Sequence, residues 1–229
     1  MKGRGHLGQS PPVRTRHPAP YLLKHNMESA TTPIREILAL TEANQRRARA
    51  IIRETGLCEA WQAVGARAEV VGSLRSGLLV KHLDIDLHIY SPAPLQVSDS
   101  FAAMTRIASD PRIRRVEYAN LLDAEDGCLE WHALYEEGDG RRWQIDMIHL
   151  AENSPWAGYF ERVADRIAAV LTDETREAIL RLKYETPDTV KIPGIAYYRA
   201  VLEGGVRDPA AFEAWLGSHP VEGIVRWIP

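Results

Sequence analysis

The sequence predicts an α+β fold, in which a small mixed β-sheet is preceded by one helix and followed by a bundle of helices. The clearest observation is the alternation of polar and apolar residues over 84–90, which is typical of a strand with one buried face. Short strand and helix patterns alternate up to about residue 150, and only helical patterns follow from residue 154. A chain of 229 residues with 45% hydrophobic content is long enough to bury the core of such a fold.

The first predicted element is a helix that begins at Pro33 and ends near Glu54. Proline suits the first turn of a helix, because the N–H groups of that turn have no partner within the helix. Apolar residues recur on one face of this segment, and Gly56 is a typical stop. A short helix over 57–64 and a strand over 69–71 are expected next.

The central part of the chain predicts a sheet that includes a hairpin. The hairpin turn contains Asp139-Gly140, a pair that readily adopts the backbone of tight turns. The elements expected here are, in order, a strand over 84–90, a loop over 91–94, a helix over 97–109, a strand over 113–118, and hairpin strands over 129–135 and 142–149.

Helices alone are expected after the sheet. Ser154-Pro155 and Asp208-Pro209 each combine a capping residue with a proline, and Thr172 is a further cap. The expected helices run from 154 to about 170, from 172 to about 185, from 194 to about 203, and onward from 208.

Composition divides the chain into three expected parts. Residues 1–27 contain four prolines, three glycines, five basic residues and no acidic residue, which predicts a flexible basic tail. Residues 28–152 are expected to form the domain that contains the sheet and the N-terminal helix. Residues 153–229 are expected to form a helical domain.

The distribution of charge and cysteine limits the classes of partner. The formal charge is −3, and because the tail is basic the remainder is strongly acidic, which disfavours general binding to nucleic acid. Cys58 and Cys128 lie far apart and no secretory signal is evident, so a cytoplasmic location is expected. No apolar run approaches the about 20 residues of a membrane span, so no membrane partner is expected.

Five residues predict a metal-assisted phosphate site. Gly72 allows the backbone to approach phosphate oxygens closely, and Ser73 adds a hydroxyl donor at the start of a short helix. Asp84 and Asp86 follow on one face of the next strand, about 7 Å apart, where they can share a divalent cation or hold two. Asp146, on the second hairpin strand, supplies a third carboxylate.

These residues resemble the motif of the DNA polymerase β-like nucleotidyltransferase superfamily over about residues 67–150. That motif is Gly-Ser, a small residue four positions after the serine, Asp-x-Asp on the next strand and a carboxylate on a later strand. Many members have serine before the first aspartate, whereas this chain has Leu83, which leaves the subfamily open. The matching residues are Gly72, Ser73, Gly77, Asp84, Asp86 and Asp146.

The resemblance implies a reaction and roles for these residues. Asp84 and Asp86 would bind two Mg²⁺ ions, for which Mn²⁺ can substitute, and Asp146 would join them and help to activate the acceptor. Gly72 and Ser73 would hold the β- and γ-phosphates. A nucleoside monophosphate would pass from a nucleoside triphosphate (NTP) to an acceptor hydroxyl, with release of pyrophosphate. Arg75 and Lys183 are weaker candidates for binding phosphate.

Several alternatives stay open. The two aspartates of the strand would also suit a solvated strand face, and Arg75 a plain surface position. A small-molecule acceptor is favoured, because the body of the protein is acidic, over a tRNA 3′ end or a protein hydroxyl of the toxin–antitoxin type. A nucleotide-binding module that kept the fold without catalysis is the alternative from another functional class.

Overall fold

The computed structural model describes residues 32–125, 127–221 and 223–229. In this part of the chain, a five-stranded mixed sheet is combined with eight helices, which confirms the predicted α+β class. The predicted basic tail, residues 1–27, lies outside the described residues. The strands are β1 (Arg67–Val70), β2 (Asp84–Ser91), β3 (Ile113–Leu121), β4 (Cys128–Glu136) and β5 (Arg142–Ala151). The helices are α1 (Ile34–Glu54), α2 (Leu57–Gln62), α3 (Gly72–Ser76), α4 (Val97–Ala108), α5 (Tyr159–Val170), α6 (Asp173–Glu185), α7 (Gly194–Leu202) and α8 (Pro209–Ser218).

The strand order of the sheet is β1-β2-β5-β4-β3. β2 and β5 are parallel, whereas the other neighbouring pairs are antiparallel. The parallel register places Asp86 of β2 beside Asp146 of β5. β4 and β5 form the predicted hairpin, in which His132 stands opposite Asp146. One row across three strands therefore carries Asp86, Asp146 and His132.

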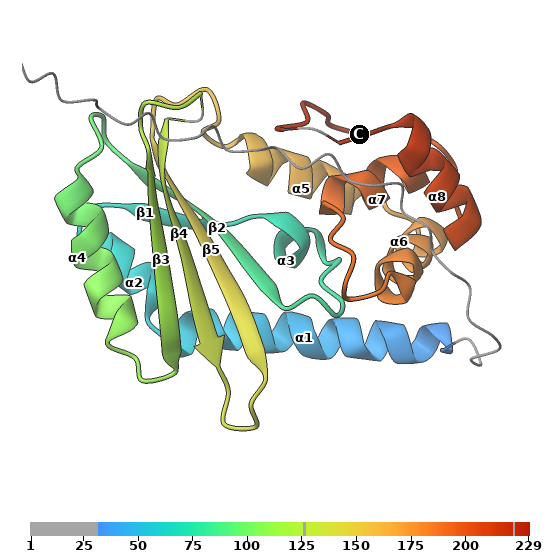
Figure 1. Cartoon of the computed structure of the whole chain (residues 1–229), viewed down its shortest axis with the longest axis horizontal. Coiled ribbons are helices and arrows are strands. Elements are labelled where there is room, and N and C mark those ends of the chain that lie inside the picture. Colours follow the sequence, from blue (N-terminus) through green and yellow to red (C-terminus); the bar gives the residue numbers. More distant parts are fainter. Residues whose placement is uncertain (1–31, 126, 222) are drawn as a thin grey trace, which may run out of the picture.

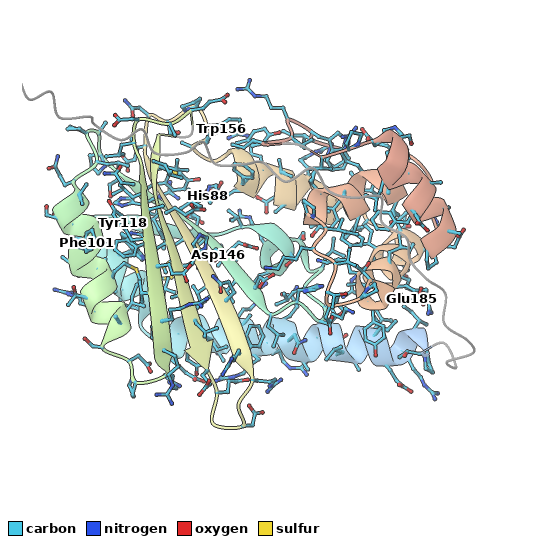
Figure 2. All side chains as sticks on the ribbon, viewed as in Figure 1. His88, Phe101, Tyr118, Asp146, Trp156 and Glu185 are labelled. Carbon is cyan, nitrogen blue, oxygen red and sulfur yellow. The ribbon has the colours of Figure 1, made fainter. Side chains whose placement is uncertain are left out.

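The two faces of the sheet differ in their environment. On one face, Ile85, Ile89 and Ile145 are fully buried among residues of α1, α2 and α4. Burial of each such side chain contributes roughly 1.5–3 kcal/mol to folding, which makes this face the main core. Figure 2 shows Phe101 and Tyr118 gathered on the α4 side, apart from Asp146. The other face carries the polar residues of β2, β4 and β5.

Helix α1 takes part in two hydrophobic clusters. Ile37, near its N-terminus, packs in a cluster with residues of α6, α7 and α8. Ala48 and Ile51, about three to four turns further on, pack beneath the sheet. Figure 1 shows α1 running from the C-terminal helices to the strands. The boundary between residues 152 and 153 stays a prediction, because the helix assigned to the first part also packs against the second.

The predicted C-terminal helices are present, with one displaced start. Thr172 caps α6 and Asp208 caps α8, each by accepting a hydrogen bond from a backbone N–H in the first turn. The helix predicted from residue 154 begins instead at Tyr159, because the preceding residues form turns that end at Gly158, with a φ of 69°. None of the helices in the described part of the chain combines the length and apolar character needed to cross a membrane.

Candidate active site

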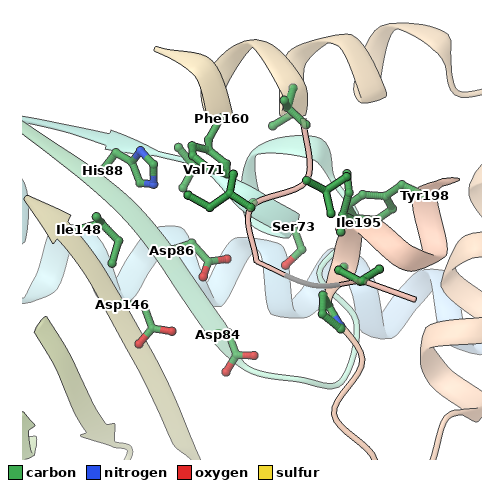
Figure 3. Close-up of a pocket in the computed structure, with 18 of the residues that line it drawn as sticks. Val71, Ser73, Asp84, Asp86, His88, Asp146, Ile148, Phe160, Ile195 and Tyr198 are labelled. Atoms are coloured by element: carbon green, nitrogen blue, oxygen red, sulfur yellow. The ribbon is translucent and has the colours of Figure 1, made fainter. Parts of the chain in front are cut away.

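A cavity of about 850 Å³ lies between the polar face of the sheet and the C-terminal helices. In Figure 3 the carboxylates of Asp84, Asp86 and Asp146 project into the same space, with Ser73 beside them. The facing wall is largely apolar and comes from α5, α7 and the C-terminal segment. The predicted site residues found in the lining are Gly72, Ser73, Asp84, Asp86, Asp146 and Lys183.

Gly72 occupies a position that only glycine can fill without displacement of a neighbour. Its φ is +62°, and a Cβ atom built there would lie 2.3 Å from Oδ2 of Asp86. The backbone at the start of α3 therefore runs directly against the carboxylate of Asp86. The peptide of Ser73 is held from outside, because Nε2 of Gln45 on α1 donates a hydrogen bond to its carbonyl oxygen at 3.3 Å. The phosphate turn and the aspartates thus form one packed unit.

The aspartates of β2 lie in an environment that opposes their charge. Desolvation, together with the negative charges of Asp146 and Asp84, raises the pKa of Asp86 to about 7. Asp84, which is more exposed at the start of the strand, has its pKa raised by the same desolvation and by Asp146. Two neighbouring carboxylates with raised pKa values form a site that a cation would stabilise.

This pKa shift predicts a pH dependence of stability in metal-free protein. The pKa of Asp86 is higher in the folded state than in the unfolded state, so its contribution to stability is present at low pH. That contribution is lost as the pH rises towards 7, by at most about 1.4 kcal/mol per pH unit. The free energy of unfolding of wild type minus that of Asp86→Asn should therefore fall between pH 5 and pH 8 in chelator.

The comparison with Asp86→Asn is needed because two buried histidines also make the free energy of unfolding depend on pH, between about pH 4 and pH 6.5. Burial lowers the pKa of His88 and of His149 to about 4, so each contributes a dependence of the opposite sign. Both histidines are present in both proteins, and the difference cancels them. A difference that stays constant or rises between pH 5 and pH 8 would contradict the shift assigned to Asp86. Urea unfolding at each pH gives the measurement.

Asp146 is held by two side chains on its own face of the sheet. Nδ1 of His132 lies 2.6 Å from Oδ1 of Asp146, and Nε2 of Gln144 donates to the same oxygen at 2.8 Å. Burial lowers the pKa of His132, but the hydrogen bond to Asp146 and the charges of Asp146 and Glu130 outweigh it, so the net shift is upward. His132 was missed in the sequence, although the register of the predicted hairpin would have placed it opposite Asp146.

Lys183 extends from α6 to the cavity. It is 7% exposed, and its Nζ donates a hydrogen bond to the carbonyl oxygen of Leu78 at 2.7 Å. Desolvation lowers its pKa to about 8, while the charges of Asp86 and Asp84 act in the opposite direction. The ring of Tyr198 on α7 lies 5.6 Å from the ammonium group. Lys183 is therefore a buried cation close to the aspartates.

Arg75 is not brought into the cavity. Its Nε and Nη2 donate to the two carboxylate oxygens of Asp165 on α5, at 2.6 and 2.8 Å, and its Nη1 donates to the carbonyl oxygen of Val70. This bidentate pair fastens α3 to α5 and engages the guanidinium outside the cavity lining. The role of Arg75 in phosphate binding stays a prediction.

The donor set is compatible with a divalent cation shared between the protein and a substrate. Carboxylate oxygens are the ligands that Mg²⁺ prefers, and proteins commonly bind it through one or two carboxylates together with substrate phosphates. Within the part of the chain that the structure describes, no three His, Cys, Asp or Glu side chains are already gathered closely enough to enclose a metal. Phosphate oxygens of a substrate would complete the ligand set of a cation held by these carboxylates.

A mixed sheet, a Gly-Ser turn and three carboxylates on adjacent strands are together typical of the nucleotidyltransferase class of enzymes. Comparison with protein families agrees, because residues 53–143 match the family described as nucleotidyltransferase domain. The predicted resemblance to the DNA polymerase β-like nucleotidyltransferase superfamily is confirmed over this segment. The match includes Gly72, Ser73, Asp84 and Asp86 and ends three residues before Asp146.

Solved structures of nucleotidyltransferases share the fold at low sequence identity. A cytoplasmic RNA terminal U-transferase matches with a TM-score of 0.52 and 15% identity, over 74% of this chain and 49% of that chain. The Cid1 poly(U) polymerase bound to MgGTP matches with a TM-score of 0.54 and 16% identity, over 74% of this chain and 53% of that chain. The chain thus spans about half the length of these structures. Comparison with curated proteins found no match.

Proposed function

We propose that the protein transfers a nucleoside monophosphate from an NTP to an acceptor hydroxyl and releases pyrophosphate. The acceptor oxygen forms a bond to the α-phosphorus while the bond to the pyrophosphate oxygen breaks, and no covalent enzyme intermediate is needed. The observation that carries the proposal is the convergence of Asp84, Asp86 and Asp146 beside Ser73 in one cavity. The family match of the surrounding segment supports it.

Each residue of the cavity has a distinct task in this proposal. Ser73 offers its hydroxyl to the phosphates, and Gly72 allows the backbone of the turn to lie directly against the Asp86 carboxylate. Lys183 contributes a buried positive charge, which offsets the charge of a triphosphate more strongly than an exposed lysine would. Asp84, Asp86 and Asp146 would hold Mg²⁺ or Mn²⁺, two ions by analogy with the family, which when bound neutralises developing charge on the attacking and leaving oxygens.

For the acceptor, we propose the 3′ hydroxyl of an RNA. Support comes from the structural neighbours, which are described as RNA terminal U-transferases and poly(U) polymerases. The acidic composition that favoured a small molecule finds no support among them. A tRNA end falls within the proposed class, whereas a small-molecule or protein hydroxyl is a separate outcome of the test.

The test is incubation with each α-labelled NTP, Mg²⁺, and separate pools of RNA, protein and small hydroxyl compounds. Label that enters RNA supports the proposal and identifies the preferred nucleotide. Label that enters another pool supports nucleotidyl transfer but overturns the RNA acceptor. Label that enters none, while the NTP still binds, indicates the nucleotide-binding module without catalysis.

Removal of the metal should abolish transfer reversibly. In excess EDTA we expect label incorporation to fall at least about a thousandfold, because the metal contributes several kcal/mol to stabilisation of the transition state. Addition of Mg²⁺ or Mn²⁺ beyond the chelator should restore it. Circular dichroism in EDTA is the control, since the fold has its own hydrophobic clusters. Full transfer in chelator would contradict a metal-dependent mechanism.

A further inference from the structure

Asp146 stands between an acidic neighbour and a basic one in the same row of the sheet. The parallel register with β2 places Asp86 on one side of it, and the antiparallel register with β4 places His132 on the other. Adjacent strands lie about 4.8 Å apart, so each neighbour is within reach of the Asp146 carboxylate. The charge of Asp86 repels this carboxylate, whereas the imidazole of His132 attracts it.

The hydrogen bonds of Asp146 fall on one of its two oxygens. His132 Nδ1 and Gln144 Nε2 both contact Oδ1, and in the described chain no hydrogen bond is formed to Oδ2. Figure 3 shows the Asp146 carboxylate directed into the space that it shares with Asp84 and Asp86. Because both hydrogen bonds are made to Oδ1, Oδ2 is the oxygen available to a cation.

The imidazole of His132 is itself held in one orientation. Its Nε2 lies 3.3 Å from Oε1 of Glu130, so both ring nitrogens have a carboxylate partner. With both nitrogens occupied, the ring has no lone pair directed at the cavity, and His132 is not itself a candidate ligand. Partners of this kind commonly orient a ligating carboxylate and tune its affinity for metal.

We infer that His132 is a positioning residue, which fixes the Asp146 carboxylate through Oδ1 so that Oδ2 is presented to the divalent cation beside Asp84 and Asp86. The inference rests on the proposed function for its catalytic consequence. It also has a consequence that does not depend on turnover, namely the affinity of the free protein for a divalent cation.

The test compares two amides that replace different nitrogens of the ring. Asparagine places its amide nitrogen close to the position of Nδ1, so His132→Asn can still donate to Asp146. Glutamine extends towards the position of Nε2, so His132→Gln keeps a group near Glu130 but loses the bond to Asp146. The first readout is the affinity of each protein for Mn²⁺ in the absence of nucleotide. It is measured by the electron paramagnetic resonance signal of the free ion.

We expect His132→Gln to weaken Mn²⁺ binding about tenfold or more, the range typical of lost second-sphere partners, and His132→Asn to stay within about threefold of wild type. In turnover, His132→Gln should lower kcat about 10–100-fold with little change in KM for the NTP, since Ser73 and Lys183 remain. Glu117→Gln is the matched control, because Glu117 flanks His132 from β3 and does not line the cavity. It should bind Mn²⁺ like wild type.

Equal Mn²⁺ affinity for wild type, His132→Asn and His132→Gln would overturn the positioning role. So would a wild-type protein that binds no Mn²⁺, because the cation is what Asp146 is positioned for. Circular dichroism establishes that each variant is folded, and an Asn variant that recovers binding excludes a general packing defect. If Mn²⁺ binding follows the expected order but no NTP is turned over, the proposed function fails and the role of His132 stands.

Discussion

Replacement of Asp86 by asparagine is expected to lower nucleotidyl transfer by about a thousandfold or more and to leave the fold intact. The amide has nearly the shape of the carboxylate but carries no charge, so it cannot hold a divalent cation with Asp84. The cation is asked to supply several kcal/mol at the transition state, and each 1.36 kcal/mol corresponds to a tenfold change in rate. Steady-state transfer of α-labelled nucleotide gives the comparison.

Thermal unfolding separates this loss from a general loss of structure. Asp86 is a desolvated carboxylate that lies beside Asp84 and Asp146, and its pKa is raised to about 7. The charged form therefore destabilises metal-free protein above that pH, and a neutral asparagine at this position avoids the unfavourable burial of charge. Asp86→Asn should unfold at a higher temperature than wild type at pH 8 in chelator. A variant that is both more stable and inactive would place the carboxylate in function rather than in folding.

Two outcomes would count against this role for Asp86. Turnover within about tenfold of wild type would show that the reaction does not depend on its charge. An inactive Asp86→Asn protein with a lower melting temperature at pH 8 would attribute the loss to structure. Asp84→Asn provides an independent check, because Asp84 lies on the same face of β2 and is less desolvated.

Replacement of Gly72 by alanine should damage both activity and stability. The new Cβ would lie 2.3 Å from Oδ2 of Asp86, a separation that van der Waals repulsion does not permit. It would also lie on a backbone with a φ of +62°, where an L-residue is strained by roughly 1–2 kcal/mol. Either the α3 turn or the Asp86 carboxylate must move, and an error of about 1 Å at such a site costs about a hundredfold in rate.

Gly65→Ala is the matched control for backbone strain. Gly65 has a φ of +80°, and a Cβ atom there would meet nothing within 4 Å. This variant should lose about as much stability as the strain term alone and keep its activity. We expect Gly72→Ala to lose more stability than Gly65→Ala and about a hundredfold in transfer. Equal losses of stability and of transfer activity in the two variants would show that the close contact between Gly72 and Asp86 does not matter for function.

Local sequence patterns predicted most of the elements but not the pairing of distant ones. The alternation over β2 and the Asp-Gly turn of the hairpin depend on neighbouring residues alone, and both were confirmed. The parallel pairing of β2 with β5 joins segments about 60 residues apart, and no local pattern encodes it. The start of α5 was placed too early, because Trp156 is buried beneath the end of the sheet in a turn and not on the helix.

The same division applies to the candidate site. Asp84, Asp86 and Asp146 could be named from strand alternation, and the structure brings all three to one cavity. Arg75 follows Ser73 closely in sequence, but its partner Asp165 is 90 positions away and draws its side chain elsewhere. His132 lacked a motif of its own, and its meaning appears only when the hairpin register sets it against Asp146.

Helix α1 limits how the cavity can change its width. It packs against the C-terminal helices near Ile37 and beneath the sheet near Ile51. The sheet and the facing helices of the cavity therefore both pack against one continuous helix of 21 residues. Gln45, between these points, also holds the peptide of Ser73. A hinge motion that separates the sheet from the C-terminal helices would have to bend or unfold α1, or disrupt its packing on one side. Because the Arg75–Asp165 pair fastens α5 to α3, closure around a substrate should be local and involve residues 223–225 of the cavity lining. Heating should melt both walls in a single transition.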